Sequence, residues 1–341
     1  MELELLVILL LVLLLPFLVR AVEENLEFFL FAMGLLAALV AGVLQRPLVL
    51  HAAREPLAIS AAVLVASLLF KWFRERLEEA VARLVERVPL PLFAALLVLL
   101  LGLLSSVVTA IVASLVLASL LHAMRLGRAS QIRLAVLGCF AIGLGAALTP
   151  VGEPLATIAV SRLQQDFWFL FRTLGRYVLP GLLLLAAAAG AATARARARE
   201  AGGGEEVPEA PEESYLDVLL RAVKIYLFVV GLSFLGAAYE EVIDRYLLAL
   251  HPAYLYWINL LSAVLDNATL AAAELSPRMT GLQVESILLG LLVSGGMLVP
   301  GNIPNIITAS RLRIRMGEWA RLAVPVGGAL LLGYFLAVFV L

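Results

Sequence analysis

Two short segments in the second half of the chain place oxygen-bearing side chains inside long apolar stretches: LLSAVLDNATLA at 260–271 and PGNIPN at 300–305. Hard cations such as Na⁺ take carboxylate, amide, hydroxyl and carbonyl oxygens as ligands. Pro and Gly within an apolar run also interrupt a helix and free backbone carbonyls for the same purpose. The segments therefore predict a cation site. Its candidate ligands are Ser262, Asp266, Asn267, Thr269, Gly301, Asn302 and Asn305.

The same two kinds of segment occur earlier in the chain. Residues 103–114 (LLSSVVTAIVAS) are similar to 260–271, and 145–163 (GAALTPVGEPLATIAVSRL) are similar to 294–312 (SGGMLVPGNIPNIITASRL). Paired interrupted segments in two halves of a membrane protein are the best sequence pointer to a transporter's binding site. The earlier pair predicts a second site. Its candidate ligands are Ser105, Ser106, Thr109, Thr149, Gly152 and Glu153.

Asp266 and Glu153 are the two acids within these segments. A carboxylate at membrane depth is costly and is by default a candidate for function, which here is to hold a sodium-type cation or a proton. Each acid also has a structural alternative: Asp266 is suited to cap a helix N-terminus, and Glu153 to interact with a helix dipole. We favour function for both, and for Asp266 the reason is that capping alone needs no charge.

The other reactive side chains suggest structural roles. Glu274 and Glu285 flank the outer ends of expected helices, so we expect both to be solvated. Cys139 is the single cysteine, which excludes an intrachain disulfide and favours a small apolar packing residue. The sequence has no nucleotide-binding loop, metal–thiolate cluster or nucleophile–base pair. We therefore predict neither an enzyme nor a bound cofactor.

The composition of the 341-residue chain is that of a helical membrane protein. Hydrophobic residues make up 63% of it, against roughly 45–50% in soluble domains, and charged residues make up 15%, against about 25%. The mean hydropathy is +1.02. A formal net charge of −1 predicts no nucleic-acid partner, so the expected partners are the lipid bilayer and small inorganic ions.

Apolar runs of about 20 residues are long enough to cross a bilayer as helices. Two runs, 90–123 and 252–275, contain the polar tips, and we interpret each as a re-entrant hairpin that enters and leaves on one side. Two interrupted runs, 133–161 and 283–309, are the expected broken helices. The eight expected crossings are 3–19, 28–45, 56–72, 133–161, 177–194, 216–238, 283–309 and 322–341.

These elements predict an all-α polytopic fold with two inverted-topology repeats. Residues 1–55 supply N-terminal scaffold spans, 56–194 form the first repeat and 216–341 the second. The charged, Gly-rich residues 195–215 between the repeats predict a flexible linker. Each repeat core contains three crossings, and an odd number inverts the second core relative to the first.

The basic residues predict the orientation. With eight crossings both termini lie on one side, and eighteen of the 25 basic residues fall on the other. The positive-inside rule makes that other side cytoplasmic, so the linker is cytoplasmic and both termini are extracytoplasmic in the cell membrane. Residues 73–88 form an amphipathic stripe suited to the membrane surface, and 239–251 occupy the equivalent place in the second half.

The motifs resemble those of the ion-transporter superfamily, which includes NhaD-type sodium/proton antiporters, arsenite permeases and divalent-anion/sodium symporters. LSAVLDNATLAAAEL at 261–275 resembles the Ser…Asp-Asn tip of the antiporters, and LTPVGEP at 148–154 resembles their Thr-Pro-x-Gly-acid break. Residues 301–327 are similar to the second break and its following linker. The resemblance covers 56–341 and is nearest to a family of uncharacterised bacterial and archaeal proteins described as cation transporters.

The resemblance implies two hairpins that meet two broken helices, a homodimer, and an elevator-like movement of the transport unit against a scaffold. The symporters carry Ser-Asn-Thr at both tips, and neither tip here has that pattern, which weighs against a dicarboxylate substrate. Carried over position by position, the family's sites comprise Ser262, Asp266, Asn267, Asn302 and Asn305 in one half, and Ser105, Ser106, Thr109, Gly152 and Glu153 in the other.

The favoured function is secondary exchange of a cation, Na⁺ first, for a proton. A bound cation favours the charged form of a carboxyl group, and desolvation in the empty site favours the protonated form, so one acid can exchange the two ions. The alternative is a sodium-coupled symporter or permease for a dicarboxylate or an oxyanion, held at a helix N-terminus. The two acids, Glu153 and Asp266, would repel a bound anion, so we rank this alternative second.

Overall fold

The computed structural model describes residues 2–23, 25–54, 56–57, 60–61, 64–65, 68, 72, 88–124, 126–199, 214–246, 248–263 and 267–341. Every regular element within these residues is a helix. A helix satisfies its own backbone hydrogen bonds, which apolar surroundings cannot do, so an apolar chain of this kind folds into helices. Most of the expected span at 56–72, nearly all of the amphipathic segment at 73–88, and linker residues 200–213 lie outside the described residues.

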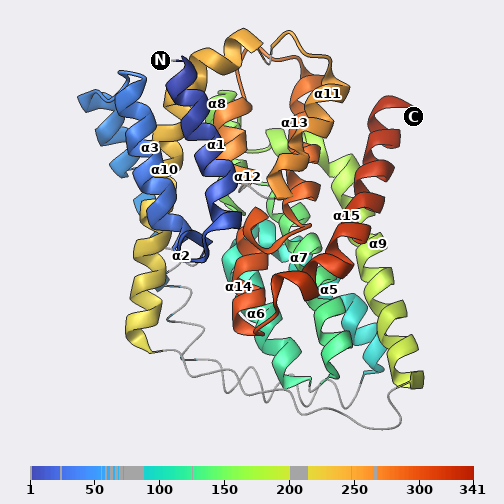
Figure 1. The fold of residues 1–341 in the computed structure, drawn as a ribbon. Coiled ribbons are helices and arrows are strands. Elements are labelled where there is room, and N and C mark those ends of the chain that lie inside the picture. The colour runs from blue at the N-terminus through green and yellow to red at the C-terminus, as the bar shows by residue number, and fades with distance from the viewer. Residues whose placement is uncertain are drawn as a thin grey trace.

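The N-terminal helices lie beside a long helix from the middle of the chain, α10 (Tyr215–Tyr246) (Figure 1). A Cβ added to Gly34 in α3 would lie 2.3 Å from the carbonyl oxygen of Gly231 in α10. Small residues allow helix backbones to approach this closely, so the two glycines fix where the helices cross. The N-terminal helices are α1 (Glu2–Leu18), α2 (Arg20–Glu23) and α3 (Leu26–Val40).

α10 continues without interruption to Tyr246. Residues 239–246 of the predicted segment 239–251 therefore form the end of α10, and the predicted span 216–238 is longer than expected. Burial explains the difference: Tyr239 is 6% exposed, and its hydroxyl donates a 2.7 Å hydrogen bond to the carbonyl oxygen of Leu5 in α1. Tyr239 thus packs against the N-terminal helix, whereas Glu241 and Arg245 are exposed.

A sharp reversal follows the first long helix of the next group. Thr109 has a φ of 76°, and its hydroxyl accepts a hydrogen bond from the Val112 N–H, so it ends one helix and caps the next. The following long helix ends at Ala146, and a non-helical segment separates it from a short helix that begins at Pro154. The helices of this group are α5 (Leu90–Val108), α6 (Ala110–Ala123), α7 (Arg128–Ala146), α8 (Pro154–Arg162) and α9 (Phe169–Arg199).

The last part of the chain repeats this order of elements, with two arms, a long helix, a break, a short helix and a final long helix, but its arms are shorter than α5 and α6. Asp266 lies outside the described residues, in the sequence between η1 and α12. The elements are α11 (Pro252–Ile258), η1 (Asn259–Ala263), α12 (Asn267–Glu274), α13 (Gly281–Gly295), η2 (Val299–Gly301), α14 (Ile303–Arg311) and α15 (Met316–Phe339).

The two groups of helices interlock in the middle of the molecule. α14 packs against α6 and α7, and α12 packs against α8, so each group's broken segment contacts the other group. Figure 1 shows α11 at the end of the molecule where the N- and C-termini lie, and α6 reaching toward the opposite end, where α9 finishes. The two pairs of arms therefore approach the centre from opposite ends.

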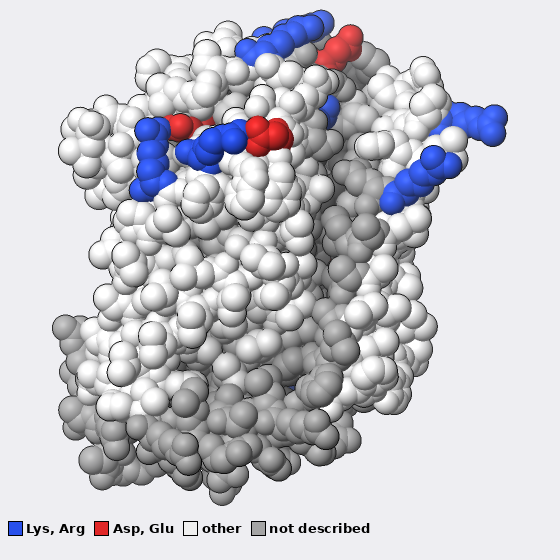
Figure 2. All heavy atoms as spheres, turned by 180° about the vertical axis from the view of Figure 1, so that it is seen from behind, with Lys and Arg blue, Asp and Glu red and all other residues white. Residues whose placement is uncertain are grey.

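Five of the described helices are long and apolar enough to cross a membrane: α5, α7, α15, residues 169–194 of α9 and residues 218–239 of α10. On the face shown in Figure 2, the described charged side chains gather toward one end, and the middle of the surface is uncharged. This is the surface pattern expected of a protein embedded in lipid.

Arg128, at the start of α7, fixes the connection between α14 and α15. Its guanidinium bonds both carboxylate oxygens of Glu318, with Nε at 3.2 Å and Nη2 at 2.9 Å. It also donates to the carbonyl oxygens of Leu312 at 2.8 Å and Arg313 at 2.9 Å. These carbonyls follow the end of a helix, where backbone acceptors lack partners within the helix. One side chain of α7 thus joins the first group of helices to the connection between α14 and α15 in the second.

We expect Arg128→Lys to lower the thermal stability of the purified protein by about 1–2 kcal/mol, because an ammonium group cannot reproduce this planar set of contacts. The matched control is Arg172→Lys, which alters an ion pair with Asp166 in which both side chains are 59% exposed. Melting in detergent measures both variants. An Arg128→Lys melting temperature no lower than that of Arg172→Lys would contradict this role.

Candidate functional site

Gly295, at the end of α13, is the point where the second pair of arms meets the second helix break. A Cβ added to it would lie 2.8 Å from the Gly301 carbonyl oxygen, 3.3 Å from Ser262 Oγ and 3.5 Å from Asn267 Cβ. Gly301 is equally enclosed, because a Cβ there would lie 2.5 Å from the Ser262 carbonyl oxygen. The structure therefore brings together three of the residues predicted for this site: Ser262, Asn267 and Gly301.

Two asparagines at this junction keep unused hydrogen-bonding capacity. Asn305 is fully buried, and its side-chain NH₂ donates to the carbonyl oxygens of Gly295 at 2.8 Å and Leu298 at 2.9 Å. Its Oδ1 atom, and Nδ2 of the buried Asn267, have no hydrogen-bond partner among the described residues. Buried polar atoms are nearly always paired, so these atoms indicate a polar site.

The first group of helices makes an equivalent junction. Ser105 donates its hydroxyl to the Ile142 carbonyl oxygen at 3.0 Å, and Ser262 donates to the Leu291 carbonyl oxygen at 3.2 Å. Both acceptors lie four residues before the end of a long helix, which is Ala146 for α7 and Gly295 for α13. The same serine contact thus anchors each pair of arms to its neighbouring long helix.

Further hydrogen bonds tie the first pair of arms to the first break. The Ala110 N–H donates to the Gly152 carbonyl oxygen at 2.7 Å, and the Thr149 hydroxyl donates to the Ser106 carbonyl oxygen. A side chain at Gly152 is excluded, because a Cβ would lie 2.0 Å from the Ala146 carbonyl oxygen. The break and the turn at Thr109 are therefore held as one unit.

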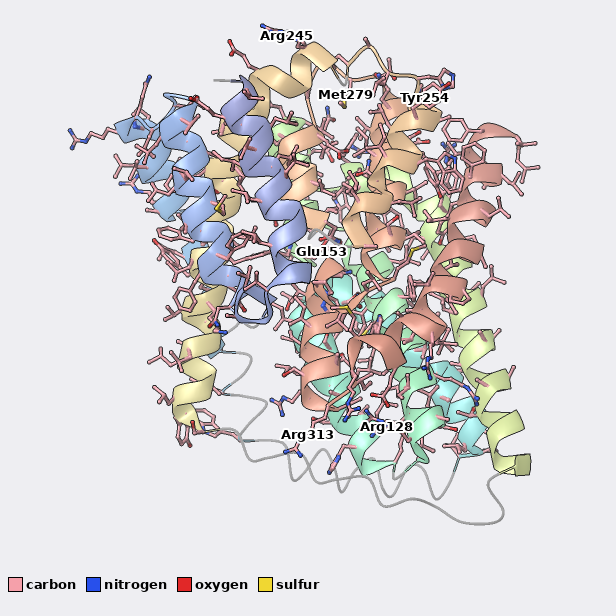
Figure 3. All side chains as sticks on the ribbon, viewed as in Figure 1. Arg128, Glu153, Arg245, Tyr254, Met279 and Arg313 are labelled. Atoms are coloured by element: carbon pink, nitrogen blue, oxygen red, sulfur yellow. The ribbon has the colours of Figure 1, made fainter. Side chains whose placement is uncertain are left out.

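Glu153 follows this break and is buried, with 5% of its surface exposed. Its carbonyl oxygen accepts the Thr157 N–H at 3.2 Å, so it occupies the capping position immediately before the first turn of α8. Figure 3 shows Glu153 midway between the end of the molecule that carries Arg245 and the end that carries Arg128. The structure thus places this acid in the interior at the level of the helix breaks.

The two broken helices contact each other directly. A Cβ added to Gly143 in α7 would lie 2.7 Å from Asn302 Nδ2, and Asn302 is only 2% exposed. Asn302 precedes α14 without using its side chain as a cap. The Cys139 thiol, also in α7, donates to Thr308 Oγ1 at 3.2 Å, so this cysteine does more than fill space. Asn302 therefore belongs to a junction between the two groups of helices.

Four other predicted site residues have no described side-chain contact at the junction between the two groups of helices. The Ser106 hydroxyl donates to the Leu103 carbonyl oxygen within its own helix, and the Thr109 hydroxyl caps α6. The side chain of Thr269 lies outside the described residues, as does the whole of Asp266.

The prediction that Glu274 and Glu285 are solvated is wrong. Glu274 is 6% exposed and accepts a hydrogen bond from the Asn259 amide, because the two arms of the pair pack together there. Glu285 forms a 2.8 Å ion pair with Arg176 of α9 and accepts a 3.2 Å hydrogen bond from Tyr177. Both acids lie near expected helix ends in the sequence, and that position does not reveal that Asn259 contacts Glu274 or that Arg176 contacts Glu285.

Within the described residues, no group of three or more His, Cys, Asp or Glu side chains gathers as a metal site. The polar junctions instead offer hydroxyl, amide and carbonyl oxygens with one buried acid, Glu153. Apolar helices of membrane-spanning length around a polar interior define a helical membrane protein.

The chain belongs to the family described as Protein of unknown function (DUF1646), whose model matches residues 3–341. The match includes the two N-terminal spans as well as both helix breaks, so the spans and the breaks are parts of one family unit. A comparison with curated proteins finds no match.

Proposed function

We propose that this protein is a secondary active transporter that exchanges a cation, most simply Na⁺, for protons. The observation that carries the proposal is the meeting of two broken helices in the interior, where Asn302 of the second break lies against Gly143 in the last turn of α7, just before the first break. Broken backbone at membrane depth is tolerated only where protein or a polar cavity surrounds it. Two such breaks at one level are costly to build and are typical of ion-binding sites in transporters.

The donor atoms favour a cation. Ser262, Asn305 and the Gly301 carbonyl supply neutral oxygens at the second junction, and Asp266 immediately precedes Asn267 in the sequence. A sodium-type ion takes such oxygens, and a neighbouring carboxylate balances its charge. Glu153 supplies an acid at the first junction. An anion at either place would be repelled by these acids.

Exchange follows from competition for the same carboxyl groups. When a cation is bound, its charge favours the ionised carboxylate; when the site is empty, desolvation favours the protonated acid. A site that alternates between these two occupied forms, and that opens to each side in turn, moves one ion in each direction. No phosphate bond or cofactor is needed for this cycle.

The architecture supports alternating access. We propose that 56–194 and 216–341 are inverted repeats, each with a re-entrant hairpin and a broken helix, because their arms approach the centre from opposite ends (Figure 1). The sharp reversal at Thr109 leads into α6, whose 14 residues, or roughly 21 Å, are too few for a bilayer core of about 30 Å, although its partner arm α5 has 19 residues and is long enough to cross. The basic-residue asymmetry favours a cytoplasmic linker and extracytoplasmic termini in the cell membrane. The elevator-like movement and the homodimer rest on the resemblance alone.

We expect Glu153→Gln to remove one step from the pH–activity profile of exchange and to weaken the coupling to the cation. The reason is that a buried carboxyl which gains and loses a proton is replaced by an amide that cannot. Exchange by the purified variant in proteoliposomes across a range of pH measures the effect, and melting of the same preparation measures folding.

A purely structural role for Glu153 makes the opposite prediction. If the acid only stabilises the N-terminus of α8, the Gln variant should lose about 0.3–1 kcal/mol of stability and keep its profile. An unchanged pH profile with a lower melting temperature would remove Glu153 from the transport site.

A further inference from the structure

A second buried acid lies inside the second pair of arms, away from the helix breaks. Glu274 ends α12, and Asn259 begins η1 and is fully buried. The Asn259 side-chain NH₂ donates to Glu274 Oε2 at 2.8 Å and to the Leu255 carbonyl oxygen at 2.8 Å. One hydrogen bond between a neutral amide and an acid therefore joins the two arms.

The surroundings of Glu274 suit a protonated carboxyl group. Its hydrogen-bond partner is a neutral amide, and Oδ1 of that amide has no hydrogen-bond partner within the described part of the chain. A buried carboxylate that lacks a positive partner costs several kcal/mol, so the neutral acid is favoured here.

Charged groups on the neighbouring elements are engaged elsewhere or exposed. α12 packs against α8, α10, α13 and η1, and η1 contains no charged residue. Of the described side chains on or beside the others, none forms an ion pair with Glu274. They are Arg162, which donates to the Gly236 carbonyl oxygen; Glu285, which pairs with Arg176; Lys224, which pairs with Glu27; Glu153, which is buried immediately before α8; and Glu241, Arg245 and Arg278, which are exposed.

The first pair of arms shows that packing does not require this polar pair. In the alignment of the two tips, Gly102 and Leu117 stand where the second pair has Asn259 and Glu274. Leu117 is fully buried, so an apolar residue fills the equivalent place. The second half has an acid and its amide partner where the first half does without both.

The long helix beside each pair of arms, α7 or α13, differs in the same way as the arms do. A Cβ added to Gly102 would lie 3.3 Å from Ala141 Cβ in α7, whereas one added to Gly290 in α13 would lie 2.9 Å from Asn259 Cβ. The glycine at this contact is Gly102 on the arm α5 in the first half, and Gly290 on the long helix α13 in the second half. Gly290 thus provides the space that Asn259 needs.

We propose that Glu274 is a proton-binding group of the second pair of arms, positioned by Asn259, whose proton leaves when a cation binds at the neighbouring break. This inference rests on the proposed exchange and adds a proton carrier to it. The step is the ionisation of a carboxylic acid: the O–H bond breaks, the proton passes to water and the electron pair stays on the carboxylate.

The structure provides a short route for coupling. η1 carries both Asn259 and Ser262, and α12 carries both Glu274 and Asn267. A cation held at the Ser262 and Asn267 ends of these elements places positive charge inside the same pair of arms. That charge stabilises a Glu274 carboxylate, because electrostatic interactions are weakly screened in the interior.

Proton release on cation binding tests the proposal without a transport assay. Purified full-length protein in weakly buffered detergent is mixed with NaCl or with choline chloride, and a pH dye reports the protons released. We expect release with NaCl only, and Glu274→Gln should release one proton fewer per protein. Gln keeps an oxygen that can accept the Asn259 bond. The matched control is Glu285→Gln, which should release as many protons as the wild type.

A second variant keeps the proposal testable if Glu274→Gln does not fold. Asn259→Ala removes the donor that favours the ionised form, so half-maximal release should shift to higher pH. Undiminished release by a folded Glu274→Gln, or an unshifted profile for Asn259→Ala, would overturn the role of Glu274. Absence of cation-dependent release from the wild type would instead overturn the proposed exchange itself.

Discussion

Asp266→Asn should abolish cation/proton exchange while leaving the protein folded. Asn has nearly the shape of Asp and caps helices as well, so α12 should still begin at Asn267. The variant lacks the charge that balances a bound cation and the group that takes up a proton. Losing one charged interaction costs about 1.5–3 kcal/mol, which is a roughly 10- to 100-fold loss of cation affinity before the loss of proton coupling is added.

The matched control for this substitution is Asp166→Asn. Asp166 is an exposed acid whose pKa is held below its usual range by hydrogen bonds from the Arg172 side chain and the Trp168 backbone. Exchange rates of the two variants in proteoliposomes, with melting curves of both, separate a site defect from a general loss of charge. Near-normal exchange by folded Asp266→Asn protein would remove this residue from the site.

Gly145→Ala should prevent correct packing of the first junction. A Cβ at Gly145 would lie 1.7 Å from the Gly102 carbonyl oxygen and 3.0 Å from Ser105 Oγ, so α5 and α7 would have to separate. Overpacking of this kind costs about 1–3 kcal/mol, and the upper end applies because the nearest atom belongs to the backbone. Since Ser105 anchors the arms to α7, we also expect exchange to fall with stability.

Gly333→Ala is the matched control for this variant. Gly333 lies in α15 with no atom within 4 Å of an added Cβ, and Ala is favoured over Gly in a helix by up to about 1 kcal/mol. The melting temperature should therefore fall for Gly145→Ala and hold or rise for Gly333→Ala. Equal melting temperatures for the two variants would show that the close contact between α5 and α7 is not required.

Local sequence patterns predicted where the long helices are interrupted. Pro and Gly within apolar runs indicated where helices stop, and the structure has non-helical residues between Ala146 and Pro154 and between Gly295 and Ile303. Burial of Glu153 also agrees with its position inside an apolar run. These features depend on nearby residues, which is why a single sequence reveals them.

Contacts between distant elements could not be predicted in the same way. The contact of Asn302 with Gly143 depends on how two groups of helices interlock, and no local pattern specifies that arrangement. The burial of Glu274 was missed because its position near a helix end suggested solvent. A signal did exist: the alignment of the two halves places Leu117 opposite Glu274, and a buried leucine in one half indicates a buried position in the other.

Exchange across a lipid membrane tests the central claim most directly. Protein in proteoliposomes with an imposed pH gradient is exposed to Na⁺, Li⁺, K⁺ and divalent cations in turn, while a pH-sensitive dye follows the gradient. The account predicts that at least one cation, Na⁺ first, collapses the gradient for the wild type and not for Asp266→Asn. If no cation collapses it, and labelled dicarboxylate or oxyanion is taken up with Na⁺ instead, the protein is a symporter and the account is wrong.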